Sequence, residues 1–226
     1  MINKEISPSL MCMNLLEVKD QINKLNDLCN IYHFDVMDGS YVANFALSPD
    51  LLKKIRSISS NEIDVHMMVE KPQNYIELFA ESGATSISIH ADRITKDAFR
   101  VIDQIHKLGC KAGVVLNPAE QFDMIENYID RIDMVTIMTV DPGFAGQPFI
   151  KETLGKVQKL DELRKEKGYK YLIQLDGNCN EGSYPYVLNC AADILIVGNS
   201  GLFSLDYDIE KAWKIMQNKM EKVIGG

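Results

Sequence analysis

The feature that most limits the fold of this chain is a short β-rich run that recurs eight times along 226 residues. Between these runs, apolar residues return at the three- and four-residue spacing of amphipathic helices, as at Leu15, Val18, Ile22 and Leu25. The chain therefore alternates strand and helix from one end to the other. The eight runs cover residues 5–10, 32–37, 63–69, 86–90, 111–116, 134–140, 171–175 and 194–197.

Alternation with a period of roughly 28 residues predicts a parallel sheet, and eight units in a chain of this size favour closure into a single (β/α)8 TIM barrel. The alternative is a doubly wound open sheet, which normally carries a glycine-rich turn after its first strand. Residues 8–12, Pro-Ser-Leu-Met-Cys, contain no glycine. Because no linker-like stretch interrupts the chain, we expect one domain over residues 1–226.

Local signals mark where several helices should begin and end. Ser48 before Pro49 predicts a helix start, with serine as the N-cap and proline at the first helical position. Asn117 before Pro118 repeats this pattern. Gly83 and other glycines are expected to end the preceding helices.

Composition excludes several classes of function. A formal net charge of -8 and a pI near 5.1 give no general attraction to nucleic acid or anionic membranes. We find no secretory leader or apolar run long enough to span a bilayer. Five cysteines, an odd number with no C-x-x-C pair, argue against a disulfide framework or a thiolate metal site. We expect a cytoplasmic protein.

Imidazoles and carboxylates recur where predicted strands approach their ends. His33 and Asp35 share one face of their strand, His66 lies near the end of the next, and Asp176 follows the seventh. The carboxyl ends of barrel strands carry the chemistry in this fold. Two nitrogen and two oxygen donors suit one divalent metal ion, Zn, Mn, Mg, Co or Fe, between which the sequence does not choose. A structural role remains the alternative for each histidine alone.

Three consecutive loops, after the sixth, seventh and eighth strands, carry small residues through which a backbone could approach an anion. Barrels commonly bind phosphate near strands seven and eight. These loops contain no lysine or arginine, so backbone N–H groups, helix dipoles and the Ser200 hydroxyl would hold the phosphate. Turn geometry is the alternative reason for the glycines. The candidate residues are Gly143, Phe144, Ala145, Gly146, Gly177, Asn178, Gly198, Asn199 and Ser200.

Five motifs, at residues 7–10, 33–39, 64–69, 138–144 and 176–177, resemble the signatures of the ribulose-phosphate 3-epimerase superfamily over nearly the whole chain. Residues 10–13, 141–150, 176–180 and 200–203 are more similar to its D-allulose-6-phosphate 3-epimerase branch than to its pentose branch. Ser40 and Ala43 depart from the family pattern, where histidine and proline are more usual.

The resemblance implies that His33, Asp35, His66 and Asp176 bind the metal, and that Asp35 and Asp176 are also the catalytic acid/base pair. It implies substrate contacts from Ser9 and His66 and from the three loops, and it implies a homo-oligomer. It also implies methionine lining of the active site, for which ordinary core packing is the alternative. These methionines are Met37, Met68 and Met138.

The function implied is metal-dependent 3-epimerisation of a sugar phosphate, D-allulose 6-phosphate to D-fructose 6-phosphate, through an enediolate. One alternative is the same reaction between D-ribulose 5-phosphate and D-xylulose 5-phosphate. A second, from another class, is a barrel that binds sugar phosphate without catalysis. A phosphate-anchored decarboxylase would need a lysine near the strand ends, and none is present there.

Overall fold

The computed structural model describes residues 2–225, and one eight-stranded parallel sheet forms its centre. Each strand pairs with the next along the chain from the second to the eighth, and the eighth also pairs with the first. All eight predicted runs are confirmed as strands, although the first and sixth are shorter than expected. The strands are β1 (Glu5–Pro8), β2 (Ile31–Met37), β3 (Glu62–Met68), β4 (Ser86–His90), β5 (Lys111–Leu116), β6 (Met134–Met138), β7 (Leu172–Asp176) and β8 (Ile194–Val197).

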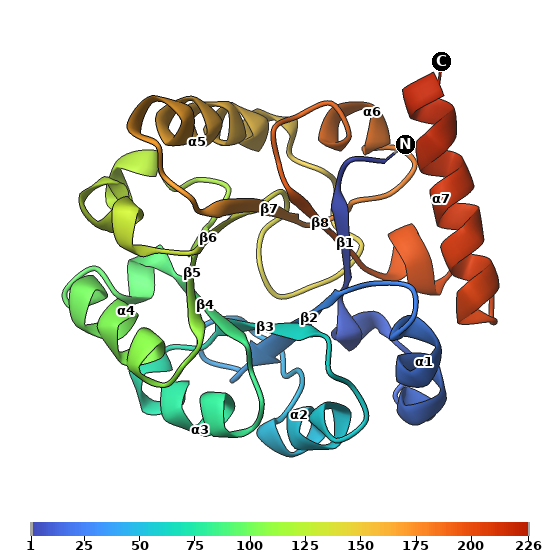
Figure 1. Ribbon diagram of the computed structural model, residues 1–226, viewed down its shortest axis with the longest axis horizontal. Helices are drawn as coiled ribbons and strands as arrows, with labels where there is room; N and C mark the ends of the chain where they lie inside the picture. Colours follow the sequence, from blue (N-terminus) through green and yellow to red (C-terminus); the bar gives the residue numbers. More distant parts are fainter. Residues whose placement is uncertain (1, 226) are drawn as a thin grey trace.

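The remaining gap in the sheet, between β1 and β2, is spanned by a parallel bridge from Ser9 to His33. The bridge joins the residue just beyond β1 to the third residue of β2, so the strands are staggered, as closure into a barrel requires. Helices surround the strands in a ring, and the last helix lies beside the first strand (Figure 1). The predicted (β/α)8 barrel is confirmed.

The outer ring consists of α-helices joined by shorter helical turns. No helix among the described residues has both the length and the apolar character that crossing a membrane demands. The α-helices are α1 (Val18–Leu25), α2 (Pro49–Arg56), α3 (Ile76–Glu81), α4 (Ala98–Lys107), α5 (Leu154–Lys167), α6 (Tyr184–Val187) and α7 (Ile209–Gly225). The shorter turns are η1 (Leu10–Cys12), η2 (Pro72–Asn74), η3 (Ala91–Arg93), η4 (Phe122–Met124), η5 (Glu126–Arg131), η6 (Lys151–Thr153) and η7 (Asn199–Phe203).

Two layers of side chains follow from the alternation of each strand. Outward residues such as Val65, Ile87 and Val135 are buried against the helices in the main apolar core, where full burial of each contributes about 1.5–3 kcal/mol. Inward residues form a different layer. A small apolar cluster of Ile31, Met134 and Ile194 joins three strands near their beginnings. Above it, buried polar side chains fill the interior, and a second apolar cluster lies nearer the strand ends.

One of the two predicted helix starts is confirmed and the other is wrong. The Ser48 Oγ accepts the Leu51 N–H at 3.4 Å at the start of α2. After Asn117 the chain forms only the short turns η4 and η5 before β6. The Lys156 ammonium donates to the carbonyl of Asn117 at 2.6 Å and to that of Pro118 at 2.8 Å. Carbonyls that would accept the first helical hydrogen bonds are thus bonded elsewhere.

Candidate metal centre

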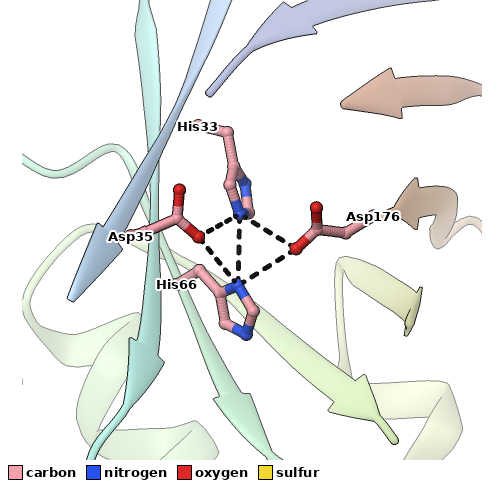
Figure 2. Close-up of side chains that lie close together, drawn as sticks. All are labelled: His33, Asp35, His66 and Asp176. Atoms are coloured by element: carbon pink, nitrogen blue, oxygen red, sulfur yellow. Dashed lines mark hydrogen bonds and ion pairs between the residues drawn. The ribbon is translucent and has the colours of Figure 1, made fainter. Parts of the chain in front are cut away.

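Three strands bring the four predicted ligands together inside the barrel. His33 and Asp35 lie on the inner face of β2, and Asp35 is the register partner of His66 on β3. Asp176 is the last residue of β7 and reaches the same point from another side of the barrel (Figure 2). The structure therefore assembles the predicted set from residues far apart in the chain.

The ligand atoms lie at the spacing that one small cation requires. The His33 Nε2 lies 3.1 Å from the His66 Nδ1, 3.4 Å from the Asp35 Oδ1 and 3.5 Å from the Asp176 Oδ2. The His66 Nδ1 lies 3.5 Å and 3.4 Å from the same two oxygens. Ligands held about 2.1 Å from one ion at tetrahedral angles lie about 3.4 Å apart. The four residues can therefore hold a metal ion.

Burial and charge favour a cation at this point. His33 and His66 are fully buried and Asp35 is 3% exposed. Burial opposes charge on each group, yet the carboxylates of Asp35 and Asp176 raise the pKa of His33 and of His66. Conversely, burial raises the pKa of Asp35 and of Asp176, but the two imidazoles outweigh it and hold both values below the usual range. Positive charge is thus stabilised where the four side chains meet.

The two histidines lie deeper in the barrel than the sequence indicated. His33 is the third residue of β2 and His66 the fifth of β3, rather than strand-end residues. The stagger of the strands explains the difference, because the loop after β1 is level with His33. A third histidine, His90, is the last residue of β4.

A pocket opens directly above the carboxylates, and the three glycine-bearing loops form its wall. His33 and His66 are fully buried and are not among the residues that line it, so a substrate contact of His66 stays a prediction. The other predicted residues all line the pocket. They are Ser9, Asp35, Met37, Met68, Met138, Gly143, Phe144, Ala145, Gly146, Asp176, Gly177, Asn178, Gly198, Asn199 and Ser200.

The loops after β7 and β8 are joined at the pocket wall. The Asn180 amide donates to the Ser200 Oγ at 2.9 Å and also to the Asn178 Oδ1. Gly177 has a φ of +123°, and a Cβ there would lie 2.7 Å from the Val140 Cγ2 and 2.9 Å from the Thr139 Oγ1. Turn geometry and close packing both require this glycine. The loop is thereby held with its backbone against the pocket.

The loop after β6 curls across the barrel opening (Figure 1). The Asn44 side chain donates to the Gly143 carbonyl at 2.7 Å, which ties this loop to the one after β2. Gly143 has a φ of +114°, and a Cβ there would lie 3.0 Å from the Val42 Cβ. Contact between these two loops covers one side of the pocket.

Sequence reasoning missed two groups of residues. Met11, Cys12, Asp141 and Cys179 line the pocket but belong to no predicted set. Asp64, Gln174 and His90 contact the four ligands or one another. One signal was available, because Asp64 precedes His66 by two residues and so shares its inward face.

Comparisons with known proteins match one family over most of the chain. The model of the Ribulose-phosphate 3 epimerase family matches residues 5–203. The ribulose-phosphate 3-epimerase of Bacillus subtilis is 36% identical over 198 residues, covering 87% of this chain and 91% of that protein. That of Aquifex aeolicus is 35% identical over 218 residues, covering 96% of this chain and 97% of that protein.

Solved structures resemble the fold at much lower identity. KGPDC from Streptococcus mutans gives a TM-score of 0.74 at 13% identity and covers 97% of this chain and 98% of its own. A mutant tryptophan synthase α-subunit from Pyrococcus furiosus gives a TM-score of 0.66 at 13% identity, with full coverage of both chains. These likenesses support the barrel alone.

The family match and the curated relatives cover most of the chain, including all four ligands and the pocket loops. The chain therefore belongs to the ribulose-phosphate 3-epimerase family and is an enzyme of the isomerase class.

Proposed function

We propose that this protein is a metal-dependent ketose-phosphate 3-epimerase that interconverts D-ribulose 5-phosphate and D-xylulose 5-phosphate. The observation that carries the proposal is the placement of Asp35 and Asp176, which flank the two imidazole nitrogens from opposite sides (Figure 2). Epimerisation at C3 needs one group to remove a proton and another to return a proton to the opposite face. The names of the relatives favour the pentulose phosphate as the substrate.

His33, Asp35, His66 and Asp176 would hold the ion, because their donor atoms and spacing suit Zn2+, Mn2+, Mg2+, Co2+ or Fe2+. Bound there, the ion would supply a Lewis acid that stabilises negative charge developing on the ketose oxygens.

In our mechanism, the Asp35 carboxylate takes the proton from C3, and the electron pair of the broken C–H bond forms the C2–C3 double bond of an enediolate. The carboxyl of Asp176 then gives a proton to the other face of C3, and the carbonyl at C2 returns. The two residues exchange roles in the reverse reaction. The lowered pKa of Asp35 favours the carboxylate, the form in which it acts as the base. Proton exchange with solvent then returns Asp35 to the carboxylate and Asp176 to the carboxyl form.

The pocket suits the rest of a sugar phosphate. Of the described residues that line it, none is a lysine or arginine, so the phosphate would be held by backbone N–H groups of the loops after β6, β7 and β8 and by the Ser200 hydroxyl. Met37, Met68 and Met138 are buried and present an apolar surface to the carbon chain. Weakly polar methionines near C3 would exclude water from the reacting atoms.

A second candidate substrate is D-allulose 6-phosphate, with D-fructose 6-phosphate as its product. The similarity of residues 10–13 and 141–150 to that branch favours it, and Met11, Cys12 and Asp141 from these segments line the pocket. With this substrate, these residues would be the ones to contact the part of the molecule in which the two sugars differ.

The experiment that decides between the substrates is a comparison of kcat/KM for D-ribulose 5-phosphate and D-allulose 6-phosphate on one metal-loaded preparation. The proposal predicts a ratio in favour of the pentulose phosphate. A higher value for the hexulose phosphate would move the assignment to the second candidate. A non-catalytic binder would exchange no substrate proton with solvent and form no product from either sugar.

A further inference from the structure

Asp64 is a fully buried aspartate beneath the metal site that the proposed mechanism does not use. Its Oδ1 accepts hydrogen bonds from the Ser86 Oγ at 3.1 Å and from the Ser88 Oγ at 2.7 Å. Its Oδ2 lies 2.8 Å from the Gln174 Nε2 and 3.2 Å from the His33 Nδ1. Four partners on three other strands thus surround one carboxylate.

This arrangement fixes the direction of the hydrogen bond to His33. Gln174 donates from its Nε2 both to Asp64 and to the Thr136 Oγ1, the latter at 2.9 Å. With donors at both oxygens, Asp64 is a pure acceptor. The His33 Nδ1 must then carry its proton and donate it to Asp64. In the neutral ring the other nitrogen, Nε2, then has a free lone pair, and this is the atom that faces Asp35, Asp176 and His66.

We propose that Asp64 is a positioning residue that fixes the tautomer and ring orientation of His33, so that the Nε2 is available to a cation. The inference rests on the proposed metal-binding role of His33 and extends it to a residue that touches neither metal nor substrate. A carboxylate behind a ligating imidazole also makes the imidazole a stronger ligand.

The two histidines need separate supports because they present different nitrogens. His33 turns its Nε2 to the centre, whereas His66 turns its Nδ1 there. Behind His66, its Nε2 lies 2.9 Å from the Nε2 of His90, whose ring stacks on that of His66 with centroids 4.9 Å apart. An imidazole therefore supports one ligand and a carboxylate supports the other.

The barrel interior leaves space for the hydrogen bond from Ser88 to Asp64. Ser88 reaches Asp64 only because its register partner on β5 is Gly113. A Cβ at Gly113 would lie 2.1 Å from the Ser88 Oγ and 3.0 Å from the Ser88 Cβ. A larger residue there would displace the hydroxyl that makes the shortest bond to the carboxylate. The space for this bond comes from a strand that provides no metal ligand.

The first test reads the tautomer directly, by long-range 15N–1H spectra of the 15N-histidine-labelled, Zn2+-loaded protein. We expect a protonated Nδ1 on His33 and a protonated Nε2 on His66. A protonated Nε2 on His33 would overturn the proposal. In the metal-free protein at alkaline pH the His33 ring is neutral, and its tautomer can be read without any metal. Failure of metal binding and failure of this inference therefore give different results.

The second test measures Zn2+ affinity by competition with a chelating dye in Asp64→Asn, which keeps the shape but can turn its NH2 towards His33. We expect affinity to fall about 10- to 100-fold and the His33 proton to move to Nε2. Asp133→Asn is the matched control, because Asp133 accepts from the His106 Nε2 at 2.8 Å away from the site. It should bind Zn2+ as the wild type does.

Wild-type affinity in Asp64→Asn would also overturn the proposal. If Asp64→Asn does not fold, the tautomer of the wild-type protein still decides the question.

Discussion

The Ser9 hydroxyl donates to the Asp35 Oδ2 at 2.7 Å, while the other oxygen of Asp35 faces both ligand imidazoles. The loop after β1 thus separates the roles of the two carboxylate oxygens. One is directed at the metal position, and the other is held at the pocket surface, where Ser9 itself is 5% exposed. In our mechanism this second oxygen is the one available to take the C3 proton.

Replacing Ser9 should therefore impair catalysis more than folding. A hydrogen bond to a charged group contributes about 1.5–3 kcal/mol, so Ser9→Ala should lower kcat by about tenfold or more. Steady-state epimerase assays measure the effect. The matched control is Ser48→Ala at the N-cap of α2, which should cost about 0.5–2 kcal/mol of unfolding free energy and leave kcat unchanged. Wild-type kcat in Ser9→Ala would contradict the role given to Ser9.

Replacing one of the two acid/base residues should separate proton exchange from epimerisation. Asp176→Asn cannot return a proton to the second face of C3, so product formation should be lost. Asp35 remains able to remove the C3 proton of one epimer, which should still exchange with deuterium from solvent, as NMR can follow. Equal retention of exchange and epimerisation would remove Asp176 from the mechanism.

The interior of the barrel should not tolerate an added methyl group at Gly113 of β5. A Cβ at Gly113 meets the Ser88 Oγ at 2.1 Å, so Gly113→Ala should lower the free energy of unfolding by about 1–3 kcal/mol through overpacking. The control is Gly155→Ala in α5, where nothing lies within 4 Å of an added Cβ. There the change should raise stability by about 0.4–1 kcal/mol. Chemical denaturation of both variants measures the contrast, and equal stability of the two would contradict it.

The thiol at the pocket wall should be unreactive at neutral pH. Burial, together with the nearby negative charge of Asp35, raises the pKa of Cys12 to about 11. Because only the thiolate is alkylated, the rate with iodoacetamide should stay low at pH 8 and rise as the pH approaches 11. Peptide mass spectrometry follows the modification of Cys12. If Cys12 reacts at pH 8 as fast as free cysteine, whose pKa is about 8.5, the raised pKa of Cys12 is contradicted.

The barrel was predictable because each strand and helix carries its own periodic signal. Three of the four ligands were predictable because His33, Asp35 and His66 are polar residues at inward positions of largely apolar strands. The short turns after Asn117 were not predictable from local signals, and the Lys156 ammonium that bonds the carbonyl of Asn117 is remote in sequence. The hydrogen bonds of Asp64 likewise come from three other strands, and only the closed barrel brings them together. One domain over the full chain, a homo-oligomer and a cytoplasmic location stay predictions.

The most direct test of the account is turnover by protein that has been stripped of metal. Dialysis against a chelator, with the metal content checked by mass spectrometry, should reduce epimerisation to background, because the two imidazoles and two carboxylates then have no Lewis acid to hold. Adding back Zn2+, Mn2+, Mg2+, Co2+ or Fe2+ should restore activity in proportion to occupancy for at least one ion. Full turnover by the metal-free protein would contradict the central claim.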